Sequence, residues 1–102
     1  MLALRPNCEH CNKDLAPDAL DAQICSYECT FCTNCVEQVL HNVCPNCGGG
    51  FTPRPIRPAQ NRKNGNYLDK DPASTTRIWK PVVAEAHTAF IKGLEMIPAH
   101  LR

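Results

Sequence analysis

Eight cysteines, all within the first 47 residues, are the side chains of this chain that could do chemistry. They fall in pairs separated by two or three residues, a spacing at which one tight turn can place two sulfurs on one metal ion. Tetrahedral zinc binds four such ligands at about 2.3 Å, so eight thiols suit two closed sites. The sequence therefore predicts two structural Zn²⁺ ions held by the pairs Cys8 and Cys11, Cys25 and Cys29, Cys32 and Cys35, and Cys44 and Cys47.

Four disulfides are the main alternative for eight cysteines. The opening Met-Leu-Ala-Leu-Arg-Pro has no apolar run long enough for a signal peptide, and no later run is long enough to span a membrane. We therefore expect a cytoplasmic location, where disulfides are rare. Iron remains open as the metal, because a tetrahedron of four sulfurs suits iron as well as zinc.

The pairing of all eight cysteines argues against an enzyme. A catalytic zinc keeps one position open for water, whereas a site with four thiolates is closed. A nucleophilic cysteine needs a free thiolate beside a base. We therefore expect no catalytic residue. His10 and His41 lie beside cysteine pairs and could each replace a ligand, but with eight thiols present we interpret them as surface residues. His87 and His100 are isolated in the sequence.

The charge is distributed unevenly along the chain. Residues 1–51 carry a net charge of −4 and residues 52–102 a net charge of +5. Ligating cysteines are thiolates, so a first half with two zinc ions carries about −8. That half is a poor candidate for nucleic-acid binding, which depends on cations that neutralise phosphates.

The cysteine-rich half, residues 1–52, has too few apolar residues to fold by burial alone, so we expect a small metal-bound α+β domain there. Residues 24–31 are predicted to form a short hairpin that carries Cys25 and Cys29. Val36, Val39 and Leu40 are spaced as one face of a short helix. We expect that helix to follow an N-cap at Thr33 or Asn34 and to end near His41.

The second half is predicted to be a linker and a tail. Residues 53–66 are rich in proline and arginine and then in polar residues, which predicts an extended linker. Residues 67–102 form the tail, in which Asp71 and Pro72 could start a helical turn. An amphipathic helix is expected at about residues 81–97, and its apolar face holds Val83, Ala86, Phe90, Leu94 and Ile97. This face could pack on the cysteine-rich domain, form a homodimer or dock a protein partner, with Trp79 as an anchor.

The cysteine spacing over residues 8–47 resembles that of the RING finger, as do the helix after Cys35 and the Cys-Pro-x-Cys at its end. The resemblance implies an interleaved cross-brace, or treble-clef-like, domain. Site 1 would hold Cys8, Cys11, Cys32 and Cys35, and site 2 would hold Cys25, Cys29, Cys44 and Cys47. Without the resemblance, a sequential arrangement is equally open, with Cys8, Cys11, Cys25 and Cys29 in one site and the last four cysteines in the other.

The chain departs from ubiquitin ligases of the RING family. Their first cysteine turn usually holds an apolar residue, whereas this chain has Glu9 and His10. Their tryptophan before the seventh ligand is absent, and Gly48 to Gly50 stand where a basic residue often follows the last ligand. The resemblance therefore does not support a groove for a ubiquitin-conjugating enzyme.

Several stretches also resemble a family of short bacterial proteins known only as a domain of unknown function. They are Leu-Arg-Pro-Asn-Cys, Tyr-Glu-Cys-Thr-Phe-Cys, Cys-Pro-Asn-Cys-Gly-Gly, Arg-Pro-Ile-Arg-Pro and Pro-Ala-Ser-Thr-Thr-Arg. The likeness runs to about Pro81. It implies a bacterial, cytoplasmic, zinc-binding protein and no established activity.

We expect a structural zinc module that acts through protein–protein contacts. A nucleic-acid-associated zinc protein is the first alternative, in which Arg54, Arg57 and Arg62 of the linker would contact phosphates. A RING-type ubiquitin-ligase-like adaptor is the second alternative.

Overall fold

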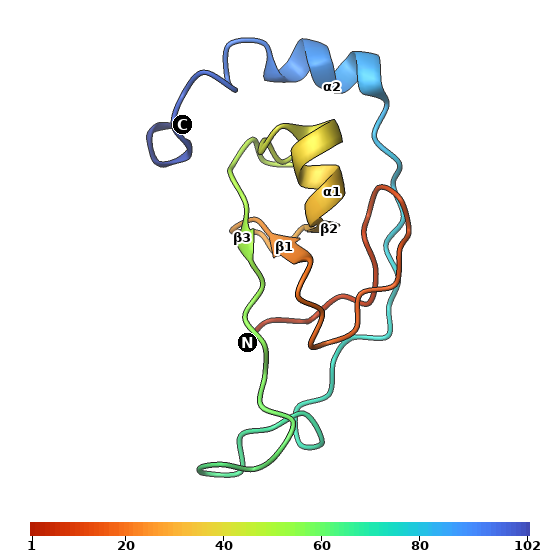
Figure 1. Ribbon diagram of the computed structural model, residues 1–102, viewed down its shortest axis with the longest axis vertical. Helices are drawn as coiled ribbons and strands as arrows, with labels where there is room; N and C mark the ends of the chain where they lie inside the picture. The colour runs from red at the N-terminus through yellow and green to blue at the C-terminus, as the bar shows by residue number, and fades with distance from the viewer.

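The structure is a computed structural model that describes all residues from 1 to 102. Its regular elements are short and are joined by long irregular segments (Figure 1). In chain order they are β1 (Ala22–Ile24), β2 (Thr30–Cys32), α1 (Thr33–Cys35) continued by a π-helical stretch (Val36–Leu40), β3 (Thr52–Pro53), α2 (Ala84–Ile91) and a 3₁₀ turn (Ala99–Leu101). None of these helices has the length and apolar composition that a membrane span requires. The predicted small α+β class is confirmed.

The predicted hairpin is present, with β1 in the middle of a three-stranded sheet. β1 pairs antiparallel with β2, with Gln23 opposite Phe31, and antiparallel with β3, with Gln23 opposite Pro53. Cys25 and Cys29 close the turn between β1 and β2, where the Cys25 N–H donates to the Cys29 carbonyl at 3.2 Å. The sheet therefore brings these two cysteines to one end of the hairpin.

The predicted helix follows β2 directly. Val36 and Leu40 are buried and Val39 is partly buried, as the apolar spacing predicts. The predicted N-cap at Thr33 or Asn34 is wrong, because Cys32 occupies the cap position with extended backbone and no side-chain bond. The Thr33 hydroxyl instead donates to the Asp21 carbonyl at 3.2 Å. The helix ends at His41, whose left-handed backbone (φ 52°) turns the chain away.

Sulfur makes up a large part of the core. Six of the eleven residues in the buried cluster are cysteines. The remaining five are Leu15, Ala22, Phe31, Val36 and Leu40. Phe51 packs edge-on against Phe31, with ring centroids 5.5 Å apart. A core with so few aliphatic side chains gains little free energy from apolar burial, so its stability depends on what binds the sulfurs.

Two arginines of the predicted linker bind inside the fold. Arg54 is only 5% exposed, and its guanidinium donates to the carbonyls of Arg5 at 2.8 Å and Ala16 at 2.9 Å. Arg57 donates to the carbonyls of Leu2 and Asp71, both at 2.6 Å. Burial lowers the pKa of the Arg54 guanidinium, which nevertheless stays protonated because arginine does not deprotonate in proteins. The guanidinium groups of both arginines are therefore bonded to backbone carbonyls and are not free to contact phosphates.

We expect Arg54→Ala to destabilise the protein by about 2–4 kcal/mol, because the carbonyls of Arg5 and Ala16 lose a charged donor and a cavity is left in place of a buried side chain. Thermal or denaturant unfolding of the zinc-loaded protein would measure this change. Arg62→Ala is the matched control, since Arg62 is exposed and makes no hydrogen bond or ion pair. Equal stability of the two variants would contradict the structural role of Arg54.

The tail is less helical than predicted. α2 covers Ala84–Ile91 rather than residues 81–97, because Val83 is extended and Lys92 leaves the helical conformation (ψ 115°) ahead of the left-handed Gly93 (φ 88°). Asp71 and Pro72 start no helix. The apolar face at Val83 and Phe90 is not the side of α2 that packs on the cysteine-rich domain. Val83 is 61% exposed and Phe90 is 45% exposed, whereas His87 and Ile91 are buried.

The residues that face inward from α2 show how it docks. His87 and Ile91 are one helical turn apart, and the His87 Nε2 atom lies 3.0 Å from the Leu40 carbonyl at the end of the first helix. α2 therefore docks on the cysteine-rich domain through His87, and contact of the exposed apolar face with a second copy or a protein partner stays a prediction. His87, which looked isolated in the sequence, is a buried contact.

Candidate metal centres

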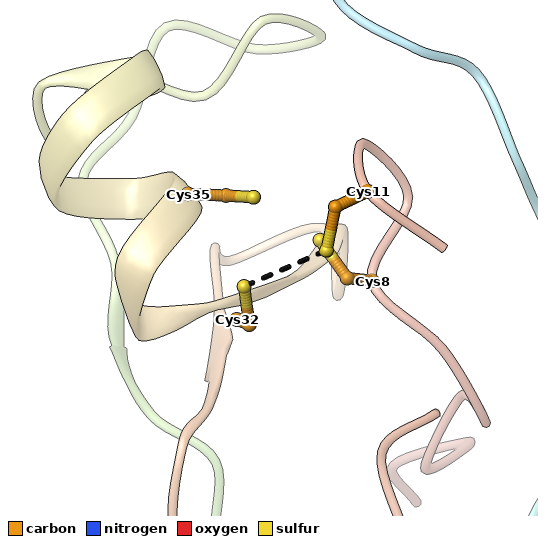
Figure 2. A group of neighbouring side chains, drawn as sticks. All are labelled: Cys8, Cys11, Cys32 and Cys35. Carbon is orange, nitrogen blue, oxygen red and sulfur yellow. Dashed lines mark hydrogen bonds between the residues drawn. The ribbon is translucent and has the colours of Figure 1, made fainter. Parts of the chain in front are cut away.

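Four cysteines from two distant parts of the chain meet in one cluster (Figure 2). The sulfurs of Cys8, Cys11, Cys32 and Cys35 all lie within 4.8 Å of one another. Four sulfurs placed about 2.3 Å from a central ion at the corners of a tetrahedron lie about 3.8 Å from one another. The distance from Cys11 Sγ to Cys32 Sγ is 3.8 Å, so the cluster has the size of a tetrahedral metal site.

Each half of this cluster is positioned by local backbone geometry. The first turn closes through bonds from the Asn12 N–H to the Cys8 carbonyl at 3.0 Å and from the Cys8 N–H to the Lys13 carbonyl at 2.9 Å. Asn12 has a left-handed backbone (φ 64°), a conformation that asparagine tolerates better than most residues. Cys32 ends β2 and Cys35 lies one helical turn later, so the strand-to-helix junction supplies the other two sulfurs.

A second cluster gathers three cysteines closely and a fourth beside them. The sulfurs of Cys25, Cys44 and Cys47 lie within 4.8 Å of one another. Cys29 is not within that distance of all three, but the Asn46 side-chain amide lies 3.4 Å from its sulfur. The turn that carries Cys44 and Cys47 is closed by two backbone bonds of 2.8 Å, from Cys44 to Gly49 and from Gly48 to Cys44.

Backbone amides point at the sulfurs of the second cluster. The Tyr27 N–H donates to Cys25 Sγ and the Gly49 N–H donates to Cys47 Sγ, both at 3.4 Å. Hydrogen bonds to sulfur favour the thiolate, which is the form that binds metal. Asn46 adds a side-chain donor to Cys29, a contact that the sequence analysis did not find because asparagine between two cysteines has no recognisable signal.

The two clusters combine the cysteine pairs in interleaved order. The first pair joins the third, and Cys25 of the second pair joins both cysteines of the fourth. The sequential alternative would place Cys25 with Cys8 and Cys11, and the structure does not bring them together. His10 and His41 belong to neither cluster, and His10 Nδ1 instead accepts the Val82 N–H at 2.9 Å. Binding of metal by the two cysteine clusters stays a prediction.

The thiols are poor anions on their own. Burial raises the pKa of Cys29, Cys32, Cys35 and Cys44 above the ordinary thiol value, and neighbouring sulfurs raise it further in Cys35. Burial acts in the same direction on Cys11, but hydrogen bonds from the Lys13 backbone and nearby thiols leave its pKa lowered. The four thiols whose pKa is raised therefore hold their protons until a cation replaces them, which is typical of sites where metal binding releases protons.

The donor set fits a soft or borderline metal. Both clusters offer only sulfur, and all eight cysteines are free thiols rather than disulfides. Ca²⁺ and Mg²⁺ prefer oxygen ligands, whereas four thiolates suit zinc or iron. Bound zinc would supply charge neutralisation and a rigid cross-link, with Cys8, Cys11, Cys32 and Cys35 at one centre and Cys25, Cys29, Cys44 and Cys47 at the other.

Glu9 has a structural role that the sequence analysis missed. Its carboxylate is buried, accepts the Thr30 N–H at 2.7 Å and pairs with Arg5 at 2.9 Å. Its N–H also donates to the Thr30 carbonyl at 2.9 Å. Glu9 therefore joins the first cysteine turn to β2, at a position where the RING comparison suggested only a missing apolar residue.

Comparison with known proteins identifies the family. Residues 1–57, which include both clusters, match the family described as "Protein of unknown function (DUF1272)". The chain belongs to this family. An uncharacterised protein of Rhizobium meliloti (strain 1021) is 56% identical over 81 residues, which cover 79% of this chain and 89% of that relative. No solved structure matches the chain.

These findings confirm the resemblance to a bacterial family of unknown function. All eight cysteines lie within the part of this DUF1272 chain that the family describes. The C-terminal helix α2 lies outside it, so the description of that helix depends on the structure alone.

Proposed function

We propose that this chain is a structural zinc module that acts through protein–protein contacts, and that neither ion is catalytic. The observation that carries the proposal is the high cysteine content of the buried core. The same cysteines that form the two clusters make up much of the buried interior, so metal would act as the centre of the fold. Four sulfurs around each ion leave no open position for a substrate or a water molecule.

The cross-brace arrangement is part of this proposal. An interleaved grouping of cysteine pairs, a hairpin between them and a helix after the third pair support a RING-like or treble-clef-like domain. The proposal concerns the arrangement of the domain and does not extend to ubiquitin-ligase activity.

The tail supports the choice of a protein partner. Six large apolar side chains of residues 79–101 are exposed, namely Trp79, Val83, Phe90, Met96, Ile97 and Leu101. Concentrated apolar exposure on a small monomer is typical of a surface that contacts another protein. A second copy of the chain is one such partner.

The nucleic-acid alternative has weaker support. Arg54 and Arg57, two of the three cations it relies on, donate to backbone carbonyls. The exposed cations Arg62, Lys63 and Lys70 remain on the loop that follows. Three phosphate contacts give weak and strongly salt-dependent binding, and the acidic metal-binding half adds repulsion.

Purification of the tagged full chain from its host, with nuclease treatment and elemental analysis, tests the proposed function. We expect two zinc ions per chain and a stoichiometric protein, or a second copy of the chain, that stays bound after nuclease treatment. Val83→Asp should lose that protein while keeping both ions, because Val83 is exposed and lies at neither cluster. Lys92→Ala serves as the control. Co-purification of nucleic acid alone would support the alternative, and a zinc-free chain would contradict the module itself.

A further inference from the structure

The segment at residues 77–82, here called the strap, lies along the first cysteine turn. That turn, residues 7–14, is called the first knuckle. We propose that the strap docks only on the metal-bound shape of the first knuckle, so that the ion held by Cys8, Cys11, Cys32 and Cys35 controls whether the tail covers the head, meaning residues 1–57. This inference rests on the proposed metal-binding role of that cluster.

Side chains join the strap to the start and end of the first knuckle. The Arg77 guanidinium donates to the Asp14 carboxylate at 2.7 Å and to both the backbone and side-chain oxygens of Asn12 at 2.9 Å. The Asn7 amide donates to the Ile78 carbonyl at 2.9 Å and accepts the Ile78 N–H at 3.4 Å.

The two residues between Cys8 and Cys11 provide the remaining contacts. The Lys80 N–H donates to the Glu9 carbonyl at 2.9 Å, and the Trp79 indole N–H donates to the His10 carbonyl at 3.1 Å. His10 Nδ1 accepts the Val82 N–H at 2.9 Å. The strap therefore donates hydrogen bonds to backbone oxygens and to a ring nitrogen whose positions are set by the shape of the first knuckle.

The metal site lies within the same short segment. Cys8 and Cys11 flank Glu9 and His10, and Asn12 follows Cys11 directly. Two backbone bonds close the knuckle on one side, while an ion on the two sulfurs would fix the other. Cys11 is exposed and forms no disulfide, so loss of the ion would leave the acceptors for the strap without a fixed spacing.

Release of the strap has a defined consequence for the surface. A groove of about 380 Å³ lies between the head and the tail, lined by Phe31, Pro45, Val82, Val83, His87 and Phe90 among others. Figure 1 shows the tail running past the first turn and over the end of the first helix. When the strap leaves, Val82 withdraws from this lining and the groove widens beside Phe31, while His87 still holds α2 on Leu40. Coupling of this kind is reciprocal, so a docked strap also holds the ion more tightly.

The single tryptophan of the chain lies in the strap and provides the readout. Its indole N–H gives one NMR peak, whose shift and hydrogen exchange report the bond to His10. In Cys11→Ser we expect one zinc per chain, a free indole peak and fast exchange. In the matched variant Cys47→Ser, which affects the other cluster, we expect one zinc per chain and an unchanged indole peak.

A second variant leaves every ligand in place. Arg77→Ala should keep two zinc ions per chain but lose one of them to a chelator about fivefold faster or more. Lys92→Ala, another exposed cation of the tail that makes no hydrogen bond or ion pair, should behave as the wild type.

The outcomes separate this inference from the proposed function. A zinc-free wild type contradicts the metal module itself. If the wild type holds two zinc ions per chain and Cys11→Ser holds one but keeps the docked indole peak, only the strap proposal is overturned. If Cys11→Ser loses its dispersed amide spectrum, Arg77→Ala decides: faster loss of one ion supports the proposal, and loss at the wild-type rate contradicts it.

Discussion

Removal of both ions by a strong chelator is expected to unfold the head, seen as collapse of the dispersed amide NMR spectrum. Structural zinc contributes about 10–16 kcal/mol of apparent binding free energy in small fingers. This exceeds or matches the whole stability of a typical domain, about 5–15 kcal/mol. Here the remaining apolar core is small, because six of its eleven members are the cysteines themselves.

The sulfurs add to this effect. Burial raises the pKa of four of the eight clustered thiols, so in the metal-free state Cys29, Cys32, Cys35 and Cys44 are protonated and bond only weakly to their neighbours. Return of zinc in excess over the chelator should restore the spectrum, and chelator already saturated with zinc is the control. Unchanged dispersion in chelated, metal-free protein would show that the head folds without metal.

The second large effect concerns which cysteines share an ion. Cys25→Ser should lower the zinc count from two per chain to one, measured by native mass spectrometry, and leave the cluster of Cys8, Cys11, Cys32 and Cys35 loaded. The reason is that the structure groups Cys25 with Cys44 and Cys47. Unfolding of the single variant should be partial, with loss of order around the hairpin turn and the turn at residues 44–49.

Double variants distinguish the two arrangements. If the clusters are interleaved, Cys25→Ser with Cys44→Ser keeps one zinc, because both cysteines belong to the same centre. Cys25→Ser with Cys8→Ser then keeps none. A sequential arrangement gives the opposite pair of results, with one zinc left in the Cys25 and Cys8 variant. The two double variants therefore serve as controls for each other.

Local sequence patterns predicted the head well. The hairpin between Cys25 and Cys29 and the helix with Val36 and Leu40 are short-range features, encoded by residues only a few positions apart. The cysteine spacing indicated two groups of sulfurs for the same reason. The interleaved order could not be derived from spacing alone, because it depends on how the hairpin brings Cys32 and Cys35 back to Cys8.

The tail and the linker were predicted less well. Arg54 and Arg57 were expected to lie in an extended linker, but each donates to backbone carbonyls far away in the sequence. Backbone carbonyls are present at every residue, so no sequence pattern shows which of them will accept an arginine. The docking side of α2 could not be predicted because hydrophobicity alone does not identify it on an eight-residue helix, where one histidine bond to Leu40 helps set the orientation.

The order of residues along the chain has a consequence for biosynthesis. All eight ligands precede Gly48, while the strap that covers the first knuckle begins at Arg77. Translation therefore delivers a complete set of sulfurs before it delivers the segment that closes over them. If the clusters bind metal as proposed, a nascent chain would take up its ions through the open knuckle before the strap emerges and covers it.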